Sequence, residues 1–133
     1  MNEKKIEIKV ERDIIAARQA GRELARELGF GLADQTRLAT AISELTRNAI
    51  QYAGEGVCIL SGVTKETANG VRVVVEDHGP GIDDIEQALQ YGFSTGKGLG
   101  AGLPGTKRLV SRLDIESKPG HTRVTIEMIR RTL

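Results

Sequence analysis

Residues 33–53 read ADQTRLATAISELTRNAIQYA and carry the pattern that decides the fold. Apolar side chains recur there at helical spacing and form one stripe, made of Leu38, Ala41, Ile42, Leu45, Ala49 and Tyr52. A stripe of this kind predicts a helix that begins at about Ala33 or Asp34, ends at Ala53 and buries one face against a second layer. Gly54 follows directly and favours the end of the helix there.

The segment before this helix predicts one strand and one further helix. Residues Ile6–Val10 alternate between apolar and charged side chains, which is typical of a half-buried strand. Asp13 then offers a helix N-cap, and the apolar residues that follow keep helical spacing until Gly29.

The segment after it predicts a pair of strands. Two apolar runs cover residues 57–63 and 71–75, and each is short enough to be a buried strand. The polar residues 64–70 lie between the runs and predict a long hairpin connection.

A glycine-rich segment dominates the second half of the chain. Residues 92–105 contain six glycines, which predicts an irregular loop instead of a helix or strand. Shorter elements are expected around it: helices over 84–90 and 106–113, a strand over 114–117, a turn over 118–121 and a last strand over 122–129. We therefore expect one α/β domain over residues 1–133, a two-layer sandwich with a mostly antiparallel mixed sheet and helices on one face.

Composition limits the possible partners. The net charge is +1, from 19 basic and 18 acidic residues, so no strong field attracts nucleic acid or an anionic membrane. Trp is absent, which leaves few platforms for stacking bases. No run approaches the ~18 apolar residues of a membrane span, and the amino terminus lacks the apolar part of a secretion signal. The single Cys58 lies in an apolar run, which predicts a buried thiol. We expect a cytoplasmic protein that binds neither nucleic acid nor membrane.

Glu44 and Asn48 form the first candidate for chemistry. They lie four residues apart on the predicted helix, about 110° and 70° from the centre of the apolar stripe, so both flank the core on one side. The carbonyl oxygen of Asn48 suits Mg²⁺, and the Glu44 carboxylate could accept a proton from a hydroxyl or orient a water. The same spacing is also common in plain surface hydrogen bonds on helices.

The second candidate is the sequence Asp77-His78-Gly79-Pro80-Gly81, which follows an apolar strand. It is compatible with a simple strand-ending turn. As a binding site, it gives the Asp77 carboxylate one task, to accept a hydrogen bond from the exocyclic amino group of adenine. Guanine presents a carbonyl at that position, so the sequence predicts a preference for ATP over GTP.

The third candidate is Gly98-Leu99-Gly100-Ala101-Gly102. The overlapping GxGxxG pattern over 100–105 does not follow a strand as a dinucleotide site requires, and residues 92–98 do not complete a P-loop. A flexible linker remains possible. The functional interpretation is a lid whose backbone N–H groups surround triphosphate oxygens, with Lys97 as a possible phosphate contact.

The three motifs in this order resemble the boxes of the GHKL ATP-binding superfamily, which includes gyrase, Hsp90, histidine kinases and MutL. Within it the chain is similar to the small serine kinases of bacterial partner-switching systems, above all over residues 16–54 and 92–117. The resemblance covers essentially the whole chain and implies a Bergerat-type ATP-binding fold. Two departures stand out: His121 where a glycine usually precedes the family threonine, and Gly98 where anti-sigma relatives have an arginine.

The resemblance also implies cofactors and roles. ATP and Mg²⁺ would be the cofactors, Glu44 the catalytic base and Asn48 the metal ligand. The implied nucleotide-binding residues are Asn48, Asp77, Gly79, Gly81, Ile82, Gly96, Lys97, Gly98, Leu99, Gly100, Ala101, Gly102, Leu103 and Thr122.

The function implied in this way is a protein serine/threonine kinase of a stressosome-type module. Its substrates would be STAS-domain antagonist or scaffold proteins, and once released it would bind and activate a PP2C-type phosphatase. The alternative is an ATP-gated anti-sigma factor or binding switch of the same superfamily.

Overall fold

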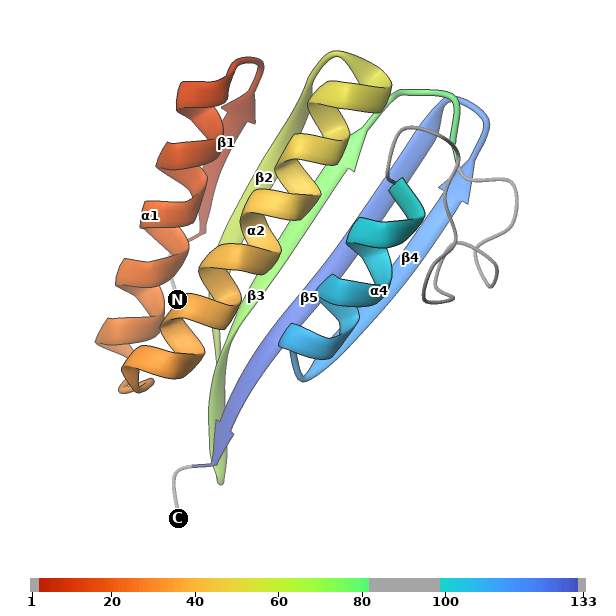
Figure 1. Cartoon of the computed structure of the whole chain (residues 1–133). Helices are drawn as coiled ribbons and strands as arrows, with labels where there is room; N and C mark the ends of the chain where they lie inside the picture. The colour runs from red at the N-terminus through yellow and green to blue at the C-terminus, as the bar shows by residue number, and fades with distance from the viewer. Residues whose placement is uncertain (1–2, 82–98, 132–133) are drawn as a thin grey trace.

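The computed structural model describes residues 3–81 and 99–131. The described elements follow one another as β1 (Lys4–Ile8), α1 (Glu11–Glu27), α2 (Leu32–Ala53), β2 (Gly56–Lys65), β3 (Ala68–Asp77), α4 (Leu99–Leu109), β4 (Arg112–Lys118) and β5 (His121–Arg131) (Figure 1).

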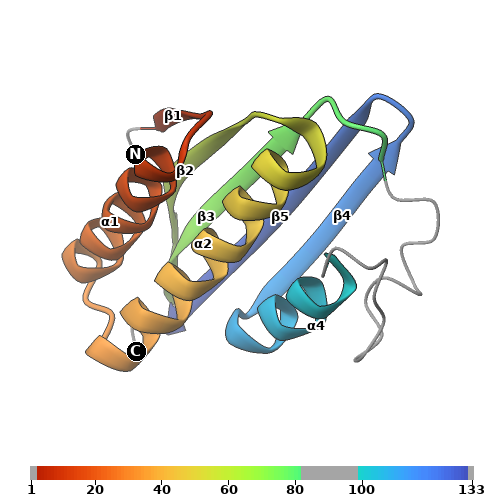
Figure 2. The same ribbon diagram turned by 45° about the horizontal axis from the view of Figure 1, so that its top comes forward.

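The strands form one five-stranded sheet in the order β1-β2-β3-β5-β4. Each neighbouring pair of described strands is antiparallel. The expected antiparallel sheet is therefore confirmed, and none of the described pairs is parallel, as a mixed sheet would require. Figures 1 and 2 show α1, α2 and α4 side by side on the same face of this sheet. The predicted two-layer sandwich is therefore confirmed.

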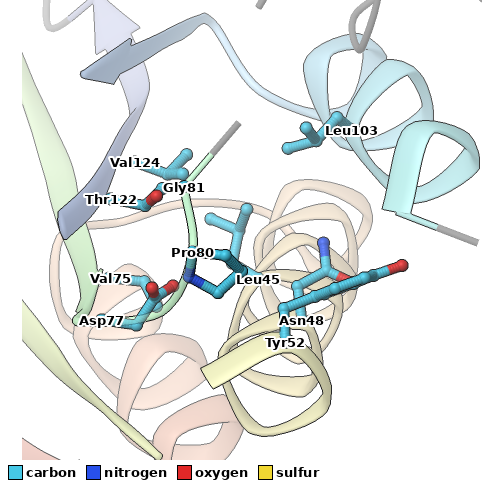
Figure 3. Close-up of a pocket in the computed structure, with 10 residues that line it drawn as sticks. All are labelled: Leu45, Asn48, Tyr52, Val75, Asp77, Pro80, Gly81, Leu103, Thr122 and Val124. Carbon is cyan, nitrogen blue, oxygen red and sulfur yellow. The ribbon is translucent and has the colours of Figure 1, made fainter. Parts of the chain in front are cut away.

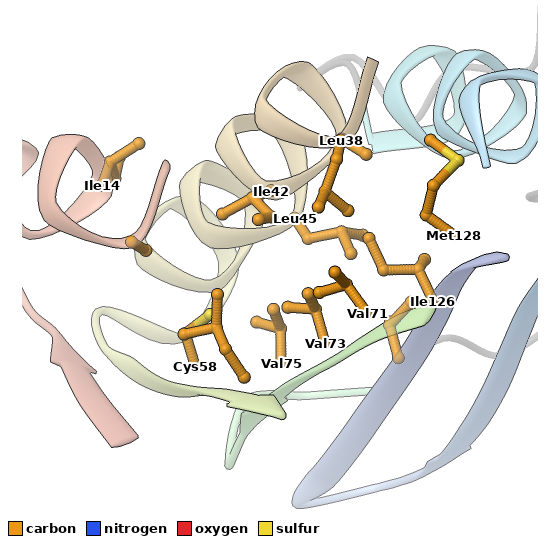
Figure 4. Packing of buried hydrophobic residues seen from close by; sticks show 14 of the residues in the cluster. Ile14, Leu38, Ile42, Leu45, Cys58, Val71, Val73, Val75, Ile126 and Met128 are labelled. Atoms are coloured by element: carbon orange, nitrogen blue, oxygen red, sulfur yellow. The ribbon is translucent and has the colours of Figure 1, made fainter. Parts of the chain in front are cut away.

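The core lies between the two layers and is aliphatic, as the composition requires (Figure 4). The apolar stripe of α2, with Leu38 and Ile42 fully buried, packs over Val71 and Val73 of β3. Cys58 of β2 belongs to the same cluster, so its predicted burial is confirmed.

The start of α1 differs from the prediction. Val10 is the N-cap, and Asp13 lies inside the first turn. The Asp13 carboxylate accepts hydrogen bonds from the backbone N–H groups of Lys9 (2.9 Å) and Val10 (3.1 Å). This bonding lowers the pKa of Asp13 and fixes the corner, so β1 ends at Ile8 instead of Val10.

The hairpin between β2 and β3 is tighter than predicted. Pairing continues to Lys65 and Ala68, so only residues 66–67 form the connection in place of the expected 64–70. The polar residues at the ends of β2 and β3 lie beyond the apolar core. Backbone hydrogen bonding between the two strands continues there although neither strand has an apolar face to bury. For the same reason β5 extends to Arg131, beyond the predicted limit of 129.

The largest difference concerns α4. The prediction of an irregular segment over 92–105 is wrong for residues 99–105, which form the first turns of a helix that ends at Leu109. Leu103 and Thr106 are 1% exposed, and the helix packs against α2. Burial of this face outweighs the cost of about 1 kcal/mol for each interior glycine. The predicted helix over 84–90 lies outside the described residues.

Candidate functional site

A pocket opens between the C-terminal half of α2, the ends of β3 and β5, the turn after β3 and α4. Figure 3 shows the ten side chains and backbone positions that line it. They are Leu45, Asn48, Tyr52, Val75, Asp77, Pro80, Gly81, Leu103, Thr122 and Val124. The pocket therefore joins residues from four elements that are far apart in the sequence.

The pocket has apolar walls and a polar floor. Asp77 and Thr122 are partners across β3 and β5, and they lie next to each other in Figure 3, with Leu103 of α4 on the opposite side. Thr122 is buried, and its hydroxyl shares a hydrogen bond of 2.7 Å with the hydroxyl of Ser117. A carboxylate and a hydroxyl below aliphatic side chains suit a flat, largely apolar ligand with hydrogen-bonding groups on one edge.

The Asp77 carboxylate is partly buried, and burial raises its pKa above the ordinary value of 3.8. The Gly79 N–H donates to Asp77 Oδ1 at 3.0 Å and opposes that shift, as do the nearby His121 and His78. One carboxylate oxygen is thus held by the turn, which fixes the orientation of the group toward the pocket.

The glycines of the turn after β3 are required by close packing. A Cβ on Gly79 would lie 2.8 Å from the Cβ of Ala53 in α2, and one on Gly81 would lie 2.6 Å from the carbonyl oxygen of Lys118. Gly81 also has a φ of +88°. The turn is therefore fitted between the end of α2 and the β4–β5 connection. Gly81 lines the pocket, whereas Gly79 acts on it through Asp77.

Asn48 lines the pocket from α2, and Figure 3 shows its amide on the side of the pocket that faces Leu103. Its Nδ2 is buried and has no hydrogen-bond partner among the described residues. A buried donor without a partner is costly, so the arrangement favours a bound group that offers acceptor oxygens. A phosphate meets that requirement, and the amide oxygen remains a suitable ligand for Mg²⁺.

Glu44 is not among the residues that line the pocket. Its side chain is 39% exposed, and Oε1 lies 3.5 Å from Nη1 of Arg47. Arg47 in turn lies 3.7 Å from Glu11 of α1, so its guanidinium lies between two carboxylates. Glu44 is thus placed on the surface of α2, one turn before Asn48.

The remaining predicted site residues divide into two groups. Ile82, Gly96, Lys97 and Gly98 lie outside the described residues. Leu99, Gly100, Ala101 and Gly102 form the first turn of α4, and Leu103 follows them with its side chain in the pocket. The roles assigned to all these residues stay predictions.

Sequence reasoning missed Tyr52 and Pro80 as pocket residues. Tyr52 lies four residues after Asn48 on the same side of α2, so the stripe that was assigned to the core extends into the pocket wall. The same is true of Leu45, Val75 and Val124, which belong to both the core and the pocket. Helical and strand spacing alone does not separate the two roles.

Residues 3–81 and 99–131 contain neither a clustered metal-binding site nor a membrane-spanning helix. No cluster of three or more His, Cys, Asp or Glu side chains in that part of the chain could hold a metal ion. None of its helices is both long enough and apolar enough to span a membrane.

Residues 33–132 match the family model of histidine kinase-, DNA gyrase B-, and HSP90-like ATPases. The chain is 50% identical over 115 residues to the serine/threonine-protein kinase RsbT of Bacillus subtilis, a match that covers 86% of each protein. It is 30% identical over 108 residues to the anti-sigma F factor of Thermoanaerobacter sp., covering 78% of this chain and 76% of that one.

One solved structure supports the fold. Part of the structure of the RsbU and RsbW domains of Rv1364c from Mycobacterium tuberculosis superposes with a TM-score of 0.68 at 22% identity. The match covers 98% of this chain and 33% of that one. At this identity the likeness shows the arrangement of helices and strands.

Proposed function

Because the chain belongs to the family of histidine kinase-, DNA gyrase B-, and HSP90-like ATPases, we propose that it is a protein serine/threonine kinase that uses ATP and Mg²⁺. The observation that carries this proposal is the 50% identity to a serine/threonine-protein kinase over 86% of both chains. The pocket supports it, since Asn48, Asp77 and Thr122 meet there around apolar walls.

In the proposed mechanism the pocket holds the nucleotide by its two ends. Asp77 accepts a hydrogen bond from the adenine amino group, and Thr122 completes that polar edge. Asn48 would hold the phosphate end, with its amide oxygen available to Mg²⁺ and its buried Nδ2 to a phosphate oxygen. Bound Mg-ATP supplies the phosphoryl group with its charge partly neutralised.

Glu44 is the proposed general base. The Glu44 side chain is 39% exposed, so a hydroxyl of another protein can reach it. A fully buried carboxylate would be out of reach of such a hydroxyl. The carboxylate would take the proton of the serine or threonine hydroxyl as the hydroxyl oxygen bonds to the γ-phosphorus and the bond from that phosphorus to the leaving ADP oxygen breaks. Arg47 restrains the carboxylate from one side.

We further propose that the substrates are STAS-domain antagonist or scaffold proteins of a stressosome-type partner-switching module in the cytoplasm. In that scheme the released kinase binds and activates a PP2C-type phosphatase. Support comes from the similarity to RsbT and from the fold shared with a third of the Mycobacterium tuberculosis chain that contains RsbU and RsbW domains.

A second candidate is an ATP-gated anti-sigma factor or binding switch. The 30% identity to an anti-sigma F factor over 78% of the chain favours it. The two candidates differ in their product, because only the kinase leaves a phosphorylated partner.

The test is transfer of phosphate to STAS-domain proteins from the same organism, with phosphosites mapped by mass spectrometry. Glu44→Gln should lower the transfer rate about 10²- to 10⁴-fold while ATP still binds. Asp34→Asn is the matched control, because Asp34 lies on the same helix and forms the same i,i+3 pair with an arginine, Arg37, at 2.8 Å.

Three results would change the assignment. Equal rates for Glu44→Gln and Asp34→Asn would show that Glu44 is not the base. Failure to bind ATP would remove the proposed function altogether. ATP-dependent capture of a sigma subunit without any phosphoprotein would favour the second candidate.

A further inference from the structure

Three polar side chains form a row across the neighbouring strands β3, β5 and β4. Asp77 is the register partner of Thr122, and Thr122 is the register partner of Ser117. Register partners lie on the same face of a sheet, and here that face is the one that the helices cover. Asp77 and Thr122 line the pocket and lie next to each other in Figure 3. Ser117 lies one strand further out and is not among the lining residues.

The position of Ser117 is unusual for its strand. The two preceding residues of β4 on the same face, Leu113 and Ile115, are apolar and pack against the core. The alternation along β4 thus predicts a further apolar side chain, whereas the chain has a hydroxyl there. The turn after β3 covers this hydroxyl, since a Cβ on Gly81 would lie 3.2 Å from Oγ of Ser117.

Ser117 and Thr122 are joined by their hydroxyl groups. Oγ of Ser117 and Oγ1 of Thr122 are 2.7 Å apart, which is the usual length of such a hydrogen bond. Each hydroxyl has one proton, so one of the two donates and the other keeps its proton for a different acceptor. If Ser117 donates, Thr122 presents a donor to the pocket. If Thr122 donates, it presents only lone pairs.

The chemistry of adenine distinguishes these two directions. In the proposed site, Asp77 accepts a hydrogen bond from the exocyclic amino group. The ring nitrogens on both sides of that amino group, N1 and N7, are acceptors. A group beside Asp77 must therefore donate in order to form a second hydrogen bond with this edge of the base.

We propose that Ser117 is a positioning residue that determines base specificity. It donates its proton to Oγ1 of Thr122 and thereby directs the Thr122 proton to the ring nitrogen beside the amino group. Asp77 as acceptor and Thr122 as donor then match adenine, whereas guanine offers a carbonyl where Asp77 needs a donor. The inference rests on the proposed nucleotide site and adds a residue outside the pocket to it.

Two ATP analogues test this direction, because 1-deaza-ATP and 7-deaza-ATP each replace one of the two acceptor nitrogens by a C–H group. Dissociation constants for ATP and both analogues are measured by calorimetry. The unaltered protein should bind one of the analogues about 2- to 12-fold more weakly than ATP, which corresponds to one net hydrogen bond. Ser117→Ala should weaken ATP binding and bring this ratio close to unity, because the Thr122 hydroxyl is then free to turn.

Ser111→Ala is the matched control. The hydroxyl of Ser111, just before β4, accepts the N–H of Ile129 in β5 at 2.9 Å. The variant therefore removes a hydroxyl link to the same strand at the end of β4 away from Ser117, and it should keep the ratio of the unaltered protein. Thr122→Val lacks the proton altogether, so its ratio should be close to unity with or without Ser117→Ala.

Equal weakening of ATP and both analogues by Ser117→Ala would show a purely structural role and overturn the inference. An unchanged ATP affinity and ratio would overturn it as well. If Ser117→Ala does not fold, the unaltered protein and Thr122→Val decide. A ratio that Thr122→Val abolishes means that Thr122 donates to the base and Ser117 to Thr122, whereas equal affinities for ATP and both analogues refute the proposal. Absence of ATP binding by the unaltered protein would instead refute the proposed function.

Discussion

The glycine at the end of the pocket turn offers a sharp test of how the site is built. Gly81 and Gly120 have nearly the same backbone conformation, with φ of +88° and +90°. Their surroundings differ, since a Cβ on Gly81 would lie 2.6 Å from the carbonyl oxygen of Lys118, whereas one on Gly120 would have no atom within 4 Å. Gly120→Ala is therefore a matched control for Gly81→Ala.

The magnitudes follow from separating the two contributions. A positive φ costs an alanine about 1–2 kcal/mol, and this cost is common to both variants. The smaller entropy of the unfolded chain with alanine is also common to both. Overlap with a backbone oxygen adds about 1–3 kcal/mol at position 81 alone, because the chain must move to relieve it. Gly81→Ala should thus lose about 2–5 kcal/mol and Gly120→Ala about 1–2 kcal/mol of unfolding free energy.

Equilibrium urea unfolding at pH 7 measures this difference, and an ATP titration measures its effect on the site. Gly81 lines the pocket, so Gly81→Ala should also weaken ATP binding, whereas Gly120→Ala should leave it unchanged. If both variants lose the same stability, the close approach to Lys118 does not constrain the turn, and the argument from packing is refuted.

The remaining predictions concern three side chains. Asp77→Asn should abolish the preference for ATP over GTP in a competition assay, because the amide offers adenine a weaker acceptor. Burial raises the pKa of Asp77 above 3.8, so the folded protein holds this proton more tightly than the unfolded chain. The stabilising effect of this bound proton is therefore present below pH 3.8 and lost as the pH rises through the pKa of Asp77 in the folded protein. In urea unfolding, Asp77→Asn should be more stable than the unaltered protein at pH 7 but not at pH 3. Leu103→Ala should lower the free energy of unfolding by about 2–5 kcal/mol in the same assay and weaken ATP binding. Leu109 lies on the same helix but outside the pocket, so Leu109→Ala should lower stability without changing ATP affinity. Burial raises the pKa of Cys58 from 9.0 to about 12. Ellman's reagent at pH 8 should therefore leave the folded protein almost unmodified and react fully with the protein in denaturant. Rapid labelling of the folded protein would contradict the burial of Cys58.

The sequence was most informative where one residue pattern has one structural solution. The stripe of α2 predicted its helix to within a residue or two, because a 22-residue helix with a regular buried face leaves little freedom. Asn48 and Asp77 were proposed as site residues from motif chemistry, and Thr122 from the resemblance to the GHKL superfamily; the structure places all three around one pocket.

The sequence was least informative where tertiary burial overrides local preference. Glycines at 100, 102 and 105 argue against a helix, yet the buried side chains of Leu103 and Thr106 hold α4 together. Likewise, helical angles placed Glu44 and Asn48 on one side of α2 but did not show that only Asn48 reaches the pocket. That distinction depends on where α4 and the turn after β3 pack, which no local pattern contains.

The two edges of the sheet limit how another protein can be recognised. The edge strand β1 is only five residues long, and the other edge strand, β4, exposes Arg112, Asp114, Glu116 and Lys118 in alternation. Short edges and charged side chains are how natural sheets resist the addition of a further strand. Recognition by β-augmentation, in which a partner peptide extends the sheet, is therefore disfavoured at both edges. A partner would instead meet side chains presented by the helices or by the broad face that they leave open.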